Sequence, residues 1–462
     1  MSADDEAGLT ASAKATVVGR SFTRRRKPCP TSVRIIFRAL AVLTALVCLG
    51  RGASAQTITQ RGFVEGRGLF YPQDAPDDPV NLVGDVLARE EVFVKPTPWI
   101  QFGAGVDARV NSHDQVERTW RIDVGDRGVL RPAISIRRLS ATLHYRRLTL
   151  DAGKQFVRWG KTDIVTPTDH FAPRDFLDIV DTELLAVTGA RAAVQLGGDA
   201  IELVVVPRFT PSRVPLIDQR WTVLPPEAAN TRVVDAGARL PAGTQAGVRW
   251  SHNAEGYEYS LSYFDGYNHL PNIEAAAPVD AITPQAAAPI CSTCAAGVVP
   301  VVVRRVYPAI KSYGADAAVP TRWFTIKGET AYFTSSSPAT DEYVLYVVQL
   351  ERQTGEWLLV AGYAGEAVTQ HRAVLTFAPD RGLTRSIVAR ASYTIGPNRS
   401  AAFEAAVRQN GGGLYVKPEY SQAYGEHWRA TVAAVAIAGE TDDFLGQYRR
   451  NSHLSLTLRY SF

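Results

Sequence analysis

Beyond position 56, the sequence contains no long hydrophobic run. A helix needs roughly 20 consecutive apolar residues to cross a bilayer, and no segment of this part reaches that length. If this part crosses a membrane, it must do so as a β-barrel, because the backbone polar groups of a spanning segment have to be hydrogen-bonded internally. The mean hydropathy of −0.08 fits strands that are apolar on one face only.

The same part of the chain lacks an excess of either charge. The whole sequence has 50 basic and 46 acidic residues, of which positions 1–55 hold nine and three, so that 41 basic and 43 acidic residues remain. The alkaline isoelectric point therefore belongs to the N-terminal region. No basic patch with interleaved aromatic residues is present, and we expect no nucleic-acid partner.

Motifs for catalysis and metal binding are also lacking. The eight His residues form no HExxH or other metal-ligand grouping, and no pair of carboxylates has a recognisable catalytic spacing. We therefore predict that the protein is not an enzyme and has neither a metal site nor a cofactor.

Cysteine is scarce, because two of the four Cys residues fall within positions 1–55 and only Cys291 and Cys294 remain. In an oxidising compartment, the simplest prediction for this CxxC pair is a local disulfide that stiffens a loop. A thioredoxin-like redox role would require a helix start in a βαβ unit, and a zinc site would require two further ligands. Both stay open as alternatives.

The N-terminal region has the features of a secretory signal peptide. Basic residues at positions 24–27 precede an apolar run over 33–50, and Ala53-Ser54-Ala55 follows it. The uncharged stretch 39–50 is too short for a transmembrane anchor. We therefore predict a Sec-type signal peptide that is cleaved after Ala55. Residues 1–55 would be an N-terminal extension and signal peptide, and residues 56–462 a single domain.

The last residues of the chain alternate between apolar and polar. Leu454, Leu456, Leu458, Tyr460 and Phe462 share one face of a predicted strand. A soluble β-sandwich rarely ends on an exposed aromatic residue. The pattern resembles the closing strand of bacterial outer-membrane β-barrels. The resemblance implies that Leu458, Tyr460 and Phe462 are recognised by the barrel-assembly machinery.

Similar alternation recurs along the chain in runs of about 9 to 13 residues, the length that a tilted strand needs to cross a membrane. The runs predict an all-β, transmembrane antiparallel up-and-down barrel of about 18 strands. Sixteen is the alternative, because 86–96 is weakly patterned and Pro308 interrupts 302–315. The predicted strands are 61–71, 86–96, 98–110, 134–146, 149–157, 186–196, 200–208, 243–252, 256–266, 302–315, 321–333, 342–351, 356–366, 384–395, 400–409, 413–423, 427–438 and 452–462.

The predicted connections alternate in length, as they do in outer-membrane barrels, which have short periplasmic turns and longer outward loops. If the C-terminus is periplasmic, the periplasmic turns are all short, including one at 316–320. The outward set contains every long connection, and only 410–413 is short on that side. The long connections are 72–85, 111–133, 158–185, 209–242, 267–301, 334–341, 367–383 and 439–451.

Side-chain alternation indicates what the wall faces. In 256–266, Tyr257, Leu261 and Tyr263 lie on one face, whereas Glu258 and Ser260 lie on the other. Outer-membrane lipid outside and water inside is the simplest interpretation, and ordinary amphipathicity around a globular core is the alternative. A barrel of 16 to 18 strands leaves an aqueous channel, because its interior is too wide for side chains to fill.

The most distinctive segment is 153–175. It resembles a family of large bacterial outer-membrane barrels, largely of unknown function, that carry G-[RK]-Q, W-G-x-x-D and P-x-D patterns. More distantly it is similar to alginate-export-type porins. The matching residues are Gly153, Lys154, Gln155, Trp159, Gly160, Asp163, Pro173 and Asp175.

This segment leads into a connection, 158–185, that is too long for a simple hairpin. We predict that it folds into the lumen and forms a constriction with charged residues of the wall. The alternative is that its Asp and Pro residues only form turns and salt bridges that pack the loop. The predicted constriction comprises Arg158, Lys161, Asp163, Asp169, Arg174 and Asp175 of the loop and Arg137, His144, Arg146, Arg191 and Arg249 of the wall.

Two functions are compatible with these features in the bacterial outer membrane. The first is a porin-like channel for passive passage of small hydrophilic solutes, with anionic solutes or saccharides as candidates. The second is a non-conducting surface barrel that serves adhesion or envelope structure through the long loops 209–242 and 267–301.

Overall fold

The computed structural model describes residues 57–76, 78–223, 233–276, 301–372, 378–379, 381–409 and 411–462. The predicted signal peptide and the predicted Cys291–Cys294 disulfide lie outside these residues. Within the described part, no helix is long and apolar enough to cross a membrane.

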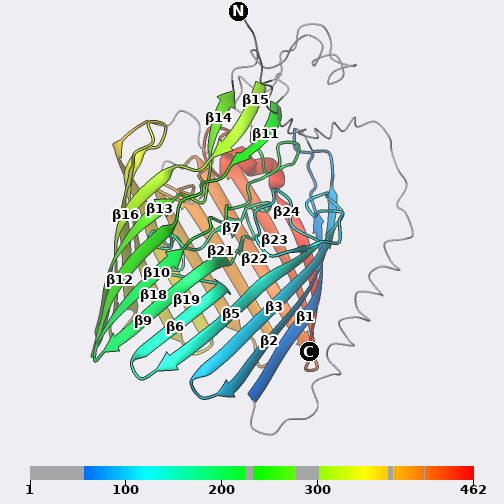
Figure 1. The fold of residues 1–462 in the computed structure, drawn as a ribbon. Coiled ribbons are helices and arrows are strands. Elements are labelled where there is room, and N and C mark those ends of the chain that lie inside the picture. Colours follow the sequence, from blue (N-terminus) through cyan, green and yellow to red (C-terminus); the bar gives the residue numbers. More distant parts are fainter. Residues whose placement is uncertain are drawn as a thin grey trace, which may run out of the picture. The chain divides into compact units, whose positions relative to one another are not determined.

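Eighteen long strands form one antiparallel sheet that closes on itself (Figure 1). Each strand pairs with the next along the chain, and the last, β24, pairs with β1 from Phe63↔Ser461 to Phe70↔Leu454. The prediction of 18 strands is confirmed. The strands are β1 (Thr57–Phe70), β2 (Leu82–Thr97), β3 (Ile100–Asn111), β5 (Ile134–Tyr145), β6 (Leu148–Gln155), β9 (Val187–Leu196), β10 (Asp199–Val206), β12 (Gln245–Ala254), β13 (Tyr257–Tyr267), β16 (Ala309–Pro320), β17 (Thr325–Ser335), β18 (Glu342–Thr354), β19 (Trp357–Gln370), β20 (Ser386–Thr394), β21 (Arg399–Arg408), β22 (Gly413–Tyr424), β23 (Trp428–Gly439) and β24 (His453–Ser461).

Shorter elements lie in the connections. β4 (Ile122–Asp123) pairs with the start of β5, and β7 (Arg174–Asp175) pairs with β8 (Glu183–Leu184). β11 (Val233–Arg239), β14 (Asn272–Ala276) and β15 (Val301–Val306) form a separate three-stranded sheet. A 3₁₀-helix, η2 (Gly446–Asn451), precedes β24.

The predicted strand 302–315 is wrong at its start. The structure divides it at Pro308 into β15, which belongs to the separate sheet, and β16, which belongs to the barrel. Proline has no N–H to continue a ladder. The predicted turn 316–320 is also misplaced, because β16 continues to Pro320. The true turn follows, and the Thr321 N–H donates to the Phe324 carbonyl oxygen at 2.9 Å.

Alternating side chains give the wall one apolar outer face. Leu454, Leu456 and Leu458 of β24 are 54%, 57% and 47% exposed. Aromatic pairs lie at the ends of strands beside the short turns, with ring centroids 4.7 Å apart for Trp357 and Tyr393. Aromatic residues of this kind are typical of the membrane–water interface. The opposite face of each strand lines the lumen and is called inward below.

Candidate functional site

The connection from β6 to β9, residues 156–186, contacts the inward face of the barrel at many points and is called the crossing loop below. It contains the predicted segment 158–185. Its start depends on Gly153, which has φ +116°, a conformation that side chains disfavour. A Cβ at Gly153 would lie 2.2 Å from the Leu139 carbonyl oxygen. The next residue, Lys154, is buried, and its ammonium pairs with Asp126.

An apolar cluster holds the loop against the inner wall. Trp159 is buried and packs edge-on against Phe171, with ring centroids 5.0 Å apart. Phe171 packs in turn against the inward Phe264 of β13 at 5.0 Å. Burying aromatic side chains against each other is a major source of packing energy. The loop is therefore a packed part of the interior.

Glu329 on β17 anchors the first half of the crossing loop. Its carboxylate is buried and accepts hydrogen bonds from the backbone N–H groups of Lys161, Thr162 and Thr168 at 2.9, 3.1 and 2.9 Å. The hydroxyl groups of Thr162 and Thr168 donate to it at 2.8 and 2.9 Å. Gly160 has φ +94°, and a Cβ there would lie 2.5 Å from the Glu329 carboxylate. This close approach of the carboxylate requires a glycine at position 160.

Asp163 extends the same anchor to β18. Its backbone N–H donates to the Gln349 side-chain oxygen at 2.8 Å, and the Gln349 amide donates back to its carboxylate at 2.6 Å. Lys327 of β17 pairs with the same carboxylate at 3.1 Å. Burial opposes ionisation of Asp163, but the bonds from Gln349 and Lys327 outweigh it and lower the pKa. Lys161 reaches Glu258 of β13 at 2.7 Å.

The second half of the loop is bound to a different part of the wall. Glu183 pairs with Arg89 of β2 at 3.1 Å and with Arg109 of β3. Asp181 pairs with Lys417 of β22 at 2.7 Å and with Arg67 of β1. Burial tends to raise the pKa of Glu183, but the two arginines hold it at about 2.

These contacts place the loop across the lumen. In the closed sheet, eight strands separate β2 from β17 in either direction around the ring. Strands related in this way lie on opposite sides of a barrel. A loop bound to β17 through Thr162 and to β2 through Glu183 must pass from one side to the other.

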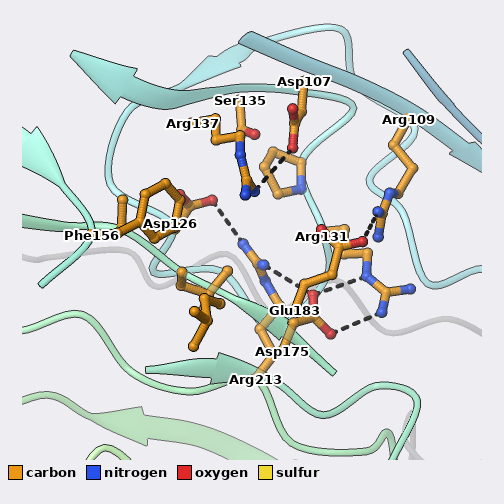
Figure 2. Close-up of a pocket in the computed structure, with 14 residues that line it drawn as sticks. Asp107, Arg109, Asp126, Arg131, Ser135, Arg137, Phe156, Asp175, Glu183 and Arg213 are labelled. Atoms are coloured by element: carbon orange, nitrogen blue, oxygen red, sulfur yellow. Dashed lines mark hydrogen bonds and ion pairs between the residues drawn. The ribbon is translucent and has the colours of Figure 1, made fainter. Parts of the chain in front are cut away.

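A third cluster joins the crossing loop to two other loops (Figure 2). Asp175 is buried and accepts two hydrogen bonds from Arg131, both at 2.9 Å, and one from Arg213 at 3.1 Å. Arg213 also donates to Asp126 at 2.9 Å. Burial opposes ionisation, but Arg131 and Arg213 keep the pKa of Asp175 far below its usual value. The ion pairs fix the positions of all three loops.

Several residues of the predicted constriction thus serve as anchors. Asp163, Asp169 and Asp175 bind other protein groups, and Asp169 accepts the Trp159 backbone N–H at 3.1 Å. Burial raises the pKa of Asp169 to about 6. Arg158 pairs with Asp169 at 3.3 Å, and half of its side chain remains exposed. Arg174 contributes its backbone N–H to the Ser212 hydroxyl at 2.9 Å.

The predicted wall residues divide into two groups. Arg191 pairs with Glu202 and Arg249 with Asp316, both inward, whereas Arg137 lies against Phe156 at the start of the loop. His144 and Arg146 do not join them and must be removed from the predicted site. They lie at the β5–β6 turn, at the opposite end of β6 from the point where the loop begins. Eight residues of β6 at about 3.3 Å each separate the two ends.

Sequence reasoning missed the strongest partners of the loop. Glu329, Gln349, Arg89 and Arg109 sit at inward positions that alternation could assign to the lumen, but no local pattern pairs them with a loop far away in sequence. Within the described residues, no group of three or more His, Cys, Asp or Glu side chains is placed to hold a metal ion.

The closed sheet, its apolar outer face and the loop across its interior define a porin-like β-barrel of the bacterial outer-membrane type. No protein-family model and no curated protein matches this sequence. Among solved structures, it is similar to OccAB4 of Acinetobacter baumannii, at 11% identity over 89% of this chain and 100% of that chain, with a TM-score of 0.49.

Two further structures are similar at the same level. A BenF-like porin from Pseudomonas fluorescens is 8% identical over 88% of this chain and 98% of that chain, with a TM-score of 0.49. The outer membrane protein opdK of Pseudomonas aeruginosa is 10% identical over 87% and 98%, with a TM-score of 0.48.

Proposed function

We propose that this protein is a passive outer-membrane channel for small hydrophilic solutes, and that the crossing loop forms its constriction. The observation that carries the proposal is the binding of one loop to β17 and β2, on opposite sides of an 18-stranded ring. A barrel of this size is too wide for its own side chains to fill. A loop across it narrows the opening to the space between the loop and the wall.

The charges that border this space orient solutes. Cationic Arg158 is half exposed on the loop, and the inward Arg459 of β24 is also partly exposed. Charges beside a low-dielectric wall focus the field and favour polar solutes over apolar ones. Anionic solutes, including acidic saccharides, are the class that these exposed cations favour.

Single-channel recording tests the proposal. The purified protein, inserted in a planar bilayer, is expected to give stable open steps in potassium chloride. Deletion of 164–180 removes Thr168 and Phe171, two residues that anchor the crossing loop to the wall. The shortened loop leaves a wider opening, so we expect the conductance to increase. Deletion of 118–121 is the control and should leave the conductance nearly unchanged, because these exposed residues lie in another loop and their side-chain bonds, Arg118 with Asp114 and Thr119 with Glu117, stay within that loop.

The outcomes distinguish the two candidate functions. Stable steps that do not change on deletion would remove the constriction but keep the channel. Absence of open steps from a folded, membrane-inserted barrel would favour the surface barrel, whose outward loops carry the separate β11–β15–β14 sheet.

A further inference from the structure

A β-bulge places two consecutive arginines on the same side of β5. In the pairing with β3, Gly105 lies opposite Arg138 and Val106 lies opposite Ile136, so that Arg137 is an extra residue. In a regular strand, consecutive side chains point to opposite faces, and a bulge disturbs this alternation. The Arg138 Cδ lies 3.3 Å from the position of a Cβ on inward Gly103. Both guanidinium groups therefore lie inside the barrel.

The crossing loop supplies a platform for both arginines. The Cζ atoms of Arg137 and Arg138 lie 4.7 and 5.4 Å from the ring centroid of Phe156, the first residue of the loop. Arg138 also lies 5.7 Å from the ring of Phe93 on β2. Stacking on aromatic faces holds guanidinium groups in place and leaves their N–H groups free at the edges. Figure 2 shows Arg137 and Phe156 side by side in the pocket that Asp107 also borders.

Within the described residues, the ion-pair contacts of this pair are longer than hydrogen bonds. The nearest carboxylates, Glu91 and Asp107, lie 3.8 to 4.0 Å away. Each of them is already bound at 2.8 Å, Glu91 by Arg61 and Asp107 by Arg89. Among the described residues, the buried Nε atoms of Arg137 and Arg138 have no hydrogen-bond partner.

The two side chains nevertheless remain open to the lumen, with 21% and 28% of their surface exposed. Arg61, Arg89, Arg137 and Arg138 lie beside two wall carboxylates, Glu91 and Asp107. The loop carboxylate Glu183 binds Arg89 but also Arg109. A guanidinium has five N–H donors in a planar fork that matches a carboxylate. The site therefore has unpaired positive charge, and the donors that can reach a solute are those of the terminal guanidinium nitrogens, because both Nε atoms are buried.

We propose that Arg137 and Arg138 form a lumenal subsite for the carboxylate group of small organic acids. The inference rests on the proposed function as a solute channel and names the chemical group that one position on its wall binds. The carboxylate takes two parallel N–H donors from one guanidinium and lies within reach of the other. Phe156 and Phe93 fix both forks before the solute arrives, which reduces the entropy lost on binding.

Lysine substitution tests the subsite without a change of charge. R137K/R138K keeps both cations but removes the planar forks and their stacking. In bilayers bathed in potassium acetate and potassium chloride, reversal potentials give the acetate-to-chloride permeability ratio. We expect this ratio to fall at least about threefold in R137K/R138K, because charge-assisted bidentate bonds are lost.

R390K is the matched control, since Arg390 is an inward arginine of β20 that pairs with Glu404 at 3.4 Å. It should leave the ratio within experimental error. An equal ratio in the unaltered protein and R137K/R138K, or an equal fall in R390K, overturns the subsite while the channel function stands.

A second measurement does not depend on conduction. Broadening of the ¹³C-acetate resonance is recorded with the full mature protein in detergent, where we expect broadening that R137K/R138K and F156L reduce and R390K does not. Absence of specific broadening in the unaltered protein overturns the subsite. Broadening from a protein that gives no open steps would support the subsite and contradict the proposed channel.

Discussion

At the scale of single residues, the motif of the crossing loop is explained by anchoring. Gly153 and Gly160 adopt backbone conformations that glycine tolerates, and each lies where a Cβ would meet another group. Trp159 packs in the interior, and Asp163 and Asp175 bind residues outside the loop. The motif carboxylates Asp163 and Asp175 thus make the loop-packing ion pairs that the alternative predicted. In the proposed channel, the side chains left for solute are those beside them, such as Arg158.

Replacement of Glu329 tests the main anchor. E329A leaves the N–H groups of Thr162 and Thr168 and the Thr168 hydroxyl without their acceptor, whereas the Thr162 hydroxyl can still donate to the Val165 carbonyl oxygen. Hydrogen bonds to a charged group contribute about 1.5–3 kcal/mol each and are not additive, so we expect the free energy of local opening to fall by about 3 kcal/mol. Amide exchange at Thr162 and Thr168 should accelerate roughly 100-fold, measured by mass spectrometry.

The control is E351A, which removes an inward carboxylate of β18 that pairs with Lys327 at 2.6 Å and is not the acceptor of the Thr162 and Thr168 hydrogen bonds. Equal acceleration in both variants would show that Glu329 has no special role in holding the loop.

Asp169 makes the stability of the loop depend on pH. Burial raises its pKa from 3.8 to about 6, so the folded loop favours the protonated form. The stabilisation is fully present below about pH 3.8 and is lost as pH rises through about 6. We expect D169N to stabilise the loop by up to about 3 kcal/mol at pH 8 and to change nothing near pH 3.5. Amide exchange of the loop at both pH values measures the difference.

D163N is the control of opposite sign. The pKa of Asp163 is lowered, so its charged form stabilises the loop, and D163N should destabilise it at pH 8. If both substitutions act in the same direction at pH 8, the electrostatic explanation fails.

At the scale of elements, the period-2 pattern and the spacing of turns predicted the number of barrel strands, because both signals depend on neighbouring residues, but they misplaced the strand that begins at Ala309. The bulge at Arg137 was not predictable, since an extra polar residue in Arg137-Arg138-Leu139 leaves the polarity pattern ambiguous. The partners of the crossing loop were also hidden. Glu329 is 161 to 168 positions away from the groups that it binds, and nothing local indicates such pairs.

The ion pairs that bind Glu183, near the end of the crossing loop, to β2 and β3 can be tested by mutation. R89Q/R109Q removes both cations that hold Glu183 while the contacts with Glu329 remain. We expect the segment around Glu183 to detach from β2 and β3, because an unpaired carboxylate is better solvated in the lumen. Single-channel records should then show a larger mean current and more current noise. A record identical to that of the unaltered protein would mean that these ion pairs do not hold the loop.

At the scale of the whole molecule, closure depends on the last residues. Phe462 and Gly62 exchange backbone hydrogen bonds at 3.0 and 3.1 Å, and β24 pairs with β1 over eight positions. Unpaired strand edges are not tolerated in lipid. The predicted recognition of Leu458, Tyr460 and Phe462 by the assembly machinery is consistent with their outward placement and stays a prediction.

Deletion of residues 458–462 should prevent assembly of the barrel. Without them, β1 has no partner over its pairs with Leu458 to Ser461, and the assembly signal is absent. The membrane fraction is expected to lose the heat-modifiable band of a folded barrel on cold SDS gels. R459Q, which changes one inward residue of the same strand, should keep that band. A folded band from the truncated chain would contradict the prediction.

The sequence separation of the anchors sets an order of events during biogenesis. The loop is synthesised well before Glu329, and Asp181 precedes Lys417 by 236 positions. The passage through the barrel therefore cannot reach its final width while the N-terminal strands assemble alone. It narrows only after most of the wall has been inserted, so in the proposed channel the restriction of solute flow is among the last properties that the maturing protein acquires.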